Sequence, residues 1–143
     1  MSEQKQERSL DSLRHEYTEV AQNARHYSNL RFVILSIFFA VMAGVGIVAF
    51  GKGQFDQHAA VVARFAGFLV IVIFWMLEER AYLFYVHCCT VAAELERSLG
   101  YTQYTTSPAP RPYLPKAIVV QRVFFFLLTL LWLYAAFAVP LSP

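Results

Sequence analysis

The apolar residues of this chain gather in three long stretches that contain no charged side chain. These uncharged stretches cover residues 32–50, 65–77 and 123–143. A helix that crosses the hydrocarbon core of a bilayer needs about 20 predominantly apolar residues, and uninterrupted runs on this scale are typical of such helices. The pattern therefore predicts membrane spans over residues 31–50, 59–77 and 117–139.

The second span continues without a helix breaker into a polar segment with a regular apolar pattern. Residues 59–99 contain no proline, and Gly100 stands where a helix usually ends. A helix over 59–99 would be about 60 Å long at 1.5 Å per residue, roughly twice the hydrocarbon thickness. We expect residues 59–77 to lie in lipid and residues 78–99 to extend into water.

The N-terminal segment predicts a matching helix. From Leu10 to Tyr27, apolar residues recur at steps of three and four, and no breaker separates them from the first span. A cytoplasmic helix over 10–30 should therefore run into the span over 31–50, while residues 1–8 should fray. A complementary apolar seam over 81–99 favours an antiparallel hairpin of the two long helices.

The character of the chain changes after Gly100. Four prolines between residues 108 and 115 exclude a continuous helix and favour an extended linker over 100–116. The predicted fold class is an all-α membrane protein with three transmembrane helices. The first two extend into a cytoplasmic antiparallel helical hairpin, and the third follows the Pro-rich linker.

The distribution of Lys and Arg predicts the topology. Five of the 12 basic residues precede or begin the first span, two lie in the following loop or early in the second span, and five lie between the end of the second span and the start of the uncharged stretch of the third. The positive-inside rule places the N-terminus and the segment 78–116 in the cytoplasm, and the loop 51–58 and the C-terminus outside. We expect a multi-pass protein of the inner (plasma) membrane.

The remaining composition argues against several function classes. The net charge of +2 is too small to favour nucleic acid as a partner, and no nucleotide-binding, zinc-protease or serine-hydrolase motif is present. The run His87-Cys88-Cys89 cannot close on one metal, because consecutive helical residues point about 100° apart. We assign no catalytic, cofactor-binding or metal-binding residue and expect no enzyme. The two cysteines are expected to be buried apolar residues, with palmitoylation as the alternative.

Small residues mark candidate contact faces within the spans. Ala40 and Gly44 lie four residues apart in the first span, and Ala63 and Gly67 have the same spacing in the second. Small residues at this spacing let helix backbones approach closely in lipid. We expect these two faces to meet near the outer side of the membrane.

A charged pair is expected where the two long helices leave the lipid. If the loop 51–58 is symmetrical, Arg31 faces Glu78, with Glu79 as the alternative acceptor. Charges at that depth are unfavourable unless they are paired or hydrated, so the pair would fix the register of the hairpin. The alternative is that Arg31 extends to lipid phosphates.

The same register makes two further predictions. Arg14 should lie opposite residues 94–96, and Tyr27 should lie opposite Tyr82.

Two segments resemble a known family. The first, EYTEVAQNARHYSNLRFVILSIFFAVMAGV, is a polar helix that runs into a span, and the second, FWMLEERAYLFYVHCCTVAAELERSL, is a span that runs out into a polar helix. Together, over residues 10–99, they resemble the SLATT family of small bacterial two-span membrane proteins. The resemblance implies a membrane effector of nucleotide-linked conflict and anti-phage systems that forms pores. The linker and third span depart from that family, and a sensor would have to be a separate protein.

These observations leave two main functions open. The first is a homo-oligomeric pore-forming or membrane-perturbing effector that is gated through its cytoplasmic helices. The second is a structural or accessory subunit of a larger membrane complex. A transporter is less favoured, because the spans carry almost no polar group.

Overall fold

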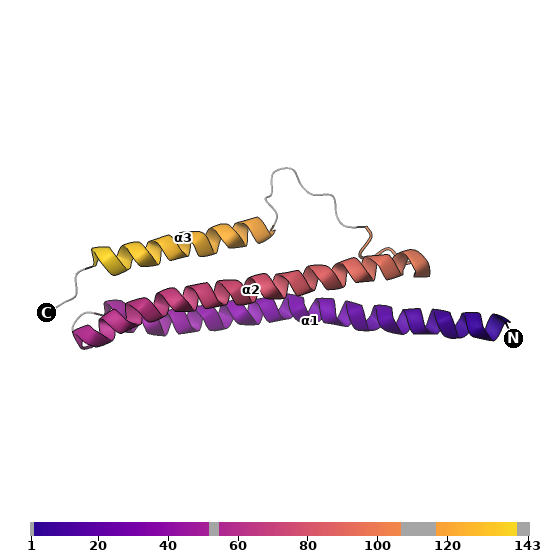
Figure 1. The fold of residues 1–143 in the computed structure, drawn as a ribbon, viewed down its shortest axis with the longest axis horizontal. Coiled ribbons are helices and arrows are strands. Elements are labelled where there is room, and N and C mark those ends of the chain that lie inside the picture. Colours follow the sequence, from indigo (N-terminus) through magenta and orange to yellow (C-terminus); the bar gives the residue numbers. More distant parts are fainter. Residues whose placement is uncertain (1, 52–54, 107–116, 140–143) are drawn as a thin grey trace. The chain divides into compact units, whose positions relative to one another are not determined.

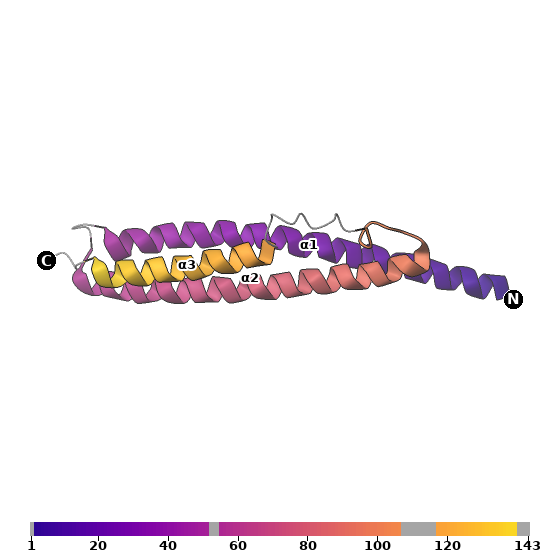
Figure 2. The ribbon, with the colours of Figure 1, turned by 90° about the horizontal axis from the view of Figure 1, so that it is seen from above.

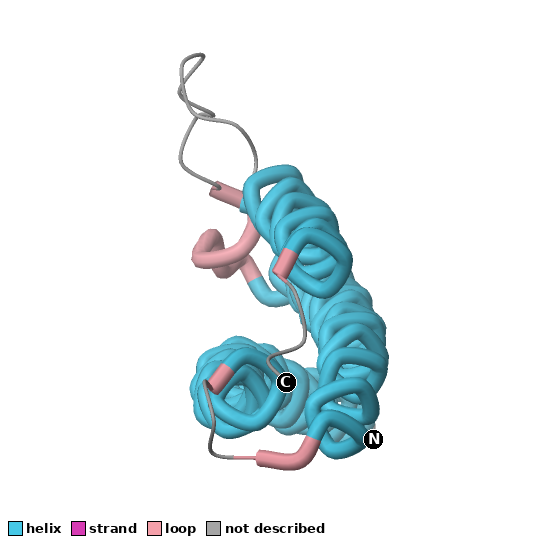
Figure 3. The backbone as a smooth tube through the Cα atoms, turned by 90° about the vertical axis from the view of Figure 1, so that its left-hand side faces the viewer, coloured by secondary structure: helices cyan, strands magenta, loops and turns pink. Residues whose placement is uncertain are grey.

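The computed structural model describes the backbone of residues 2–51, 55–106 and 117–139, and their side chains from Leu10 onward. It contains three helices, α1 (Ser2–Phe50), α2 (Gln57–Leu99) and α3 (Ala117–Ala138) (Figure 1 and Figure 2). The regular elements in this described part are all helical (Figure 3). Each helix is long and apolar enough to cross a membrane, so the prediction of an all-α protein with three candidate spans is confirmed.

The beginnings of the long helices differ slightly from the prediction. α1 begins at Ser2, eight residues before the predicted start of the helix at Leu10. The segment contains Glu, Gln, Lys and Arg, which favour helix, and no Gly or Pro. α2 begins at Gln57, just after Asp56, a residue type preferred at the N-cap. The backbone carbonyl of Asp56 accepts a hydrogen bond from the Ala60 N–H at 3.0 Å.

The end of α2 has the predicted position and a clear cause. Gly100 adopts a left-handed backbone conformation with φ of 75°, which glycine reaches without steric penalty. The backbone N–H groups of Gly100 and Tyr101 both donate to the carbonyl of Glu96, at 2.8 and 3.2 Å. Residues 102–106 then form a turn, in which the Thr106 N–H donates to the Thr102 carbonyl. The predicted extended linker falls largely on residues 107–116, which lie outside the described residues.

The chain divides into two compact units, which we describe separately. The polar unit comprises Met1–Arg31 and Arg80–Leu114, and the apolar unit comprises Phe32–Glu79 and Pro115–Pro143. The polar unit therefore holds the N-terminal part of α1 and the C-terminal part of α2. The apolar unit holds the remaining parts of both helices together with α3.

Aromatic side chains from all three helices build the core of the apolar unit. Phe38 of α1 and Phe125 of α3 are fully buried, and their ring centroids lie 5.5 Å apart. From α2, Phe74 packs against Phe38, and Trp75 stacks on Phe125 with nearly parallel rings. Figure 2 shows α3 lying along these parts of α1 and α2. The third span is therefore part of the core rather than a separate anchor.

Small side chains form the helix contact in the polar unit. The buried apolar residues of its helices are Ala21, Ala24, Ala81, Cys88 and Ala92. They follow the apolar seams expected over 10–27 and 81–99, and their small size allows the two helices to pack closely. Tyr27 and Phe84 stack across this contact, with centroids 5.3 Å apart and planes at 11°.

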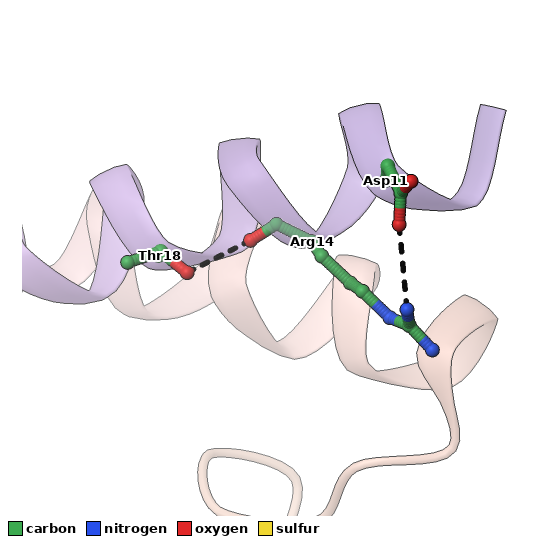
Figure 4. A network of polar contacts seen from close by, with 3 residues as sticks. All are labelled: Asp11, Arg14 and Thr18. Atoms are coloured by element: carbon green, nitrogen blue, oxygen red, sulfur yellow. Dashed lines mark hydrogen bonds and ion pairs between the residues drawn. The ribbon is translucent and has the colours of Figure 1, made fainter. Parts of the chain in front are cut away.

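The register of this contact differs from the prediction. Tyr27 stacks on Phe84 rather than lying opposite Tyr82, and Tyr17 rather than Arg14 reaches Glu96. Arg14 instead forms an exposed ion pair with Asp11 of its own helix at 3.4 Å, and its carbonyl accepts a bond from Thr18 (Figure 4).

The assumption of a symmetrical loop explains the error in register. In the apolar unit, Arg64 reaches the carbonyl of Ala49 near the end of α1. Gln57, where α2 begins, precedes Arg64 by about two helical turns. The first turns of α2 therefore extend past the end of α1, and a register centred on the loop is wrong.

Candidate functional site

The two predicted small-residue faces do not meet. Ala63 and Gly67 are buried, but a Cβ atom placed on Gly67 would lie 2.0 Å from Cζ2 of Trp132 in α3. Ala40 is exposed, and a Cβ atom on Gly44 would have open space around it. The expected contact is wrong because the indole of α3 occupies the space above Gly67. This leaves the Ala40–Gly44 face uncovered by the described residues.

The predicted charged residues Glu79 and Arg31 each have a partner within their own unit. Both carboxylate oxygens of Glu79 accept bonds from Arg122 of α3, from Nε at 2.6 Å and from Nη2 at 2.9 Å. This bidentate geometry is the strongest form of an arginine–carboxylate pair. Arg31, in the polar unit, lies over the ring of Tyr82, with 5.4 Å between Cζ and the ring centroid.

Glu78 is fully buried in the apolar unit. Arg31 belongs to the other unit, so the pairing of Arg31 with Glu78 stays a prediction. The single changes Arg31→Glu and Glu78→Arg should each lower thermal stability in detergent by about 3 kcal/mol, because each would leave a charge unpaired. The double exchange should restore most of that loss. The charge exchange between Arg31 and Glu79 is the matched comparison, since Glu79 is bonded to Arg122. Additive losses in both double variants would exclude the predicted pair.

Sequence reasoning missed an arginine that joins all three helices of the apolar unit. Arg64 of α2 donates from Nη1 to the carbonyls of Ala136 and Val139, at 2.8 and 2.9 Å. Its Nε donates to the carbonyl of Ala49 at 3.3 Å. The last carbonyls of a helix have no partner within the helix, and a cation there also complements the helix dipole. Arg64 therefore caps the C-terminal ends of both α1 and α3.

Aromatic side chains hold Arg64 in place. Its Cζ lies 5.3 Å from the ring centroid of Phe50, and its own carbonyl accepts a bond of 2.9 Å from the indole N–H of Trp132. The signal in the sequence is a lone arginine early in a span. Which carbonyls it meets depends on α3, and spacing in the sequence does not reveal that.

The polar unit contains a buried carboxylate that was also missed. Glu96 is fully buried and accepts hydrogen bonds from the Tyr17 hydroxyl at 2.9 Å and from two backbone N–H groups. These are the N–H of Tyr104, at 2.9 Å to both oxygens, and the N–H of Thr105 at 2.8 Å. The rings of Tyr101 and Tyr104 pack against Tyr17. Glu96 thus joins α1 to the turn that follows α2, and we call this group the Glu96 cluster.

Hydrogen bonding decides the ionisation of the Glu96 cluster. Burial by itself raises the pKa of Glu96, but the bonds donated by Tyr104, Thr105 and Tyr17 favour the carboxylate, so its pKa is lowered below the ordinary value of 4.5. Burial and the bond to Glu96 raise the pKa of Tyr17 to about 12 from 10.0. Glu96 is therefore ionised at neutral pH and Tyr17 is its neutral donor.

These pKa shifts predict a defined pH window for the turn after α2. A lowered carboxyl pKa gives a stabilisation that is complete above the ordinary value of 4.5 and is lost as the pH falls through the folded-state pKa. The raised tyrosine pKa gives a stabilisation that is lost as the pH rises from 10.0 toward about 12. The protection of the amides in residues 101–106 against hydrogen exchange, taken relative to an unfolded chain at the same pH, should therefore fall at both extremes.

Single substitutions show which side chain sets the acid limit of that pH window and which sets the alkaline limit. Glu96→Gln should accelerate exchange at neutral pH and remove the acid dependence, whereas Tyr17→Phe should remove the alkaline dependence. The matched control is Glu94→Gln, since Glu94 is exposed on the same helix. Equal exchange in the Glu96 and Glu94 variants would contradict the role of this carboxylate.

The cysteine run lies beside an open groove in the polar unit. Cys88 is buried, Cys89 is partly buried and His87 is exposed, so the three side chains point to different sides. The groove, of about 570 Å³, is lined by Tyr85, Cys89 and Tyr104 among others. Burial raises the pKa of Cys89, which disfavours the reactive thiolate. The described residues contain no cluster of metal-ligating side chains.

Comparison with known proteins gives no relative: no family model, no curated protein and no solved structure matches this chain.

Proposed function

We propose that this chain is a homo-oligomeric protein of the bacterial inner membrane that forms a pore or perturbs the bilayer. The observation that carries the proposal is the uncovered Ala40–Gly44 face of α1. Gly44 has open space around it, while the small-residue face of α2 is already filled by Trp132. Close packing against a small-residue face is a common basis of helix association in lipid, so a second copy is the favoured occupant. Three helices of one chain are also too few to enclose a pore.

The proposed topology follows from the basic residues. The N-terminus and the polar unit lie in the cytoplasm, and the loop between α1 and α2 and the C-terminus lie outside. The first two helices then extend from the membrane as an antiparallel hairpin. Reporter fusions at residues 1 and 143 should report opposite sides of the membrane, and fusions that report the same side would contradict this topology.

The polar unit is the proposed site of control. The Glu96 cluster connects α1 with the turn after α2, and the chain from that turn leads to α3. A separate sensor protein that binds the Glu96 cluster would therefore act on the span in α1 directly and on the span in α3 through the chain that follows the turn. The resemblance of residues 10–99 to the SLATT family supports an effector role in anti-phage defence.

The proposal is tested by induced expression in bacteria. The wild-type chain should form crosslinked oligomers in native membranes and should dissipate the membrane potential. Gly44→Ile should weaken both effects, because it fills the proposed face, and a Cβ atom at this position meets none of the described residues within 4 Å. Gly46→Ile is the matched control, since Gly46 also has open space but lies on another side of α1. Only monomeric crosslinking products together with an unchanged membrane potential would overturn the proposal.

A second function is favoured by apolar residues exposed in the polar unit. Leu83 is 62% exposed, and Phe84 and Val86 are also exposed, although this part of α2 is proposed to extend into water. Exposed apolar side chains in a part of the chain that extends into water suit a protein partner. The chain would then be a structural or accessory subunit of a membrane complex. Two results would support this function over the first. Expression of the chain should have no effect on growth, and the chain should co-purify with one fixed partner in a complex that depends on Leu83.

A further inference from the structure

An apolar groove runs between α2 and α3 in the apolar unit. It has a volume of about 380 Å³, and its lining includes Phe65 and Phe68 of α2 and Leu133 and Phe137 of α3. The indole of Trp132 also lines the groove. Phe65 and Phe137 are among the most exposed apolar side chains of the unit, and such a surface is suited to hydrocarbon.

One charged group lines the same groove. Arg64 belongs to its lining and is held there by the carbonyls of Ala49, Ala136 and Val139. A guanidinium has five N–H groups, and these bonds use Nε and both N–H groups of Nη1. Among the residues that the structure describes, the two N–H groups of Nη2 meet no acceptor. Arg64 is only partly buried, and it lines the open groove.

We propose that this groove binds an anionic phospholipid, whose phosphate has no headgroup cation beside it, with one acyl chain against Trp132 and the phosphate accepting hydrogen bonds from Nη2 of Arg64. Charge complementarity selects this occupant, because an anionic phosphate satisfies the remaining donors and hydrocarbon matches the lining. The carbonyl bonds fix the guanidinium before the lipid arrives, which reduces the entropy lost on binding. The site requires only that the apolar unit is embedded in a bilayer, and it does not depend on the pore.

Trp132 provides a direct probe of the acyl chain. The chain has two tryptophans, so Trp75→Phe leaves Trp132 as the single emitter in the full-length protein. The protein is reconstituted in neutral phosphatidylcholine vesicles with a small mole fraction of lipid that carries brominated acyl chains, which quench tryptophan on contact. Brominated phosphatidylglycerol should quench Trp132 several-fold more than its mole fraction predicts. Brominated diacylglycerol, which lacks the phosphate, should quench only in proportion to its mole fraction.

Two substitutions in α3 locate the binding site. Ala136→Phe places a ring in the groove while its backbone carbonyl can still bond Arg64, and should abolish the excess quenching. The matched control is Ala138→Phe, since Ala138 is exposed and does not line the groove; it should leave the excess unchanged. Equal quenching by the two brominated lipids, or excess quenching that survives in Ala136→Phe, would overturn the proposal. The comparison of the two lipids needs no groove variant, so it stands even if Ala136→Phe fails to fold.

Discussion

Replacing Gly67 by alanine should lower the stability of the apolar unit by about 3 kcal/mol, the upper part of the range for overpacked cores. The added Cβ would lie 2.0 Å from Cζ2 of Trp132 and within 2.7 Å of two further indole atoms. The indole cannot simply turn away, because its N–H donates to the carbonyl of Arg64 at 2.9 Å. The expected result is a lower midpoint of thermal unfolding in detergent, measured by tryptophan fluorescence and circular dichroism.

Two further variants separate the clash from a general effect of glycine. Gly46→Ala adds the same methyl group where a Cβ meets open space, and should be neutral or stabilising by up to about 1 kcal/mol. In a Trp132→Leu background, Gly67→Ala should destabilise much less, because the contacting ring is gone. If Gly67→Ala were as stable as Gly46→Ala, the packing of α3 on Gly67 would be wrong.

Removing the guanidinium of Arg64 should destabilise the same unit by about 3 kcal/mol. Hydrogen bonds that involve a charged group contribute roughly 1.5–3 kcal/mol each, and Arg64 donates two short ones and one longer one. Arg64→Met keeps much of the side-chain volume but leaves the carbonyls of two helix ends without this donor. Hydrogen exchange should accelerate in the last turns of both α1 and α3, which are far apart in the sequence.

The control for this prediction lies on the same helix. Arg80→Met removes an exposed arginine from the polar unit and should change stability by less than about 1 kcal/mol. Arg64→Lys should have an intermediate effect, because an ammonium cannot reproduce the fork of the guanidinium. Faster exchange at the end of only one of the two helices would contradict the proposed joint cap.

The sequence predicts the helices well because periodicity and breakers are local properties. Uncharged stretches located the three helices that are long and apolar enough to cross a membrane, and Gly100 marked the end of α2 through its own backbone conformation. The register of the long helices is not a local property. It depends on how far α2 extends past α1, and the loop composition carries no information about that length.

The predicted contact between the two small-residue faces was wrong for a related reason. Two small-residue faces of equal spacing are compatible with each other, but each is equally compatible with a third helix. The fit of Trp132 over Gly67 decides between these arrangements, and only the packed structure shows it. Glu96 was overlooked because its partners are backbone N–H groups after Gly100, which no pattern of side chains reveals.

The cap formed by Arg64 also has a consequence for synthesis of the chain. Its acceptor in α1 is made before Arg64, but Ala136 follows Arg64 by 72 residues. At about 5–20 residues per second, several seconds pass before that acceptor exists. Throughout this interval the carbonyl of Ala49 is the one acceptor of the three that exists, so water or lipid phosphate must take the place of the other two until α3 arrives.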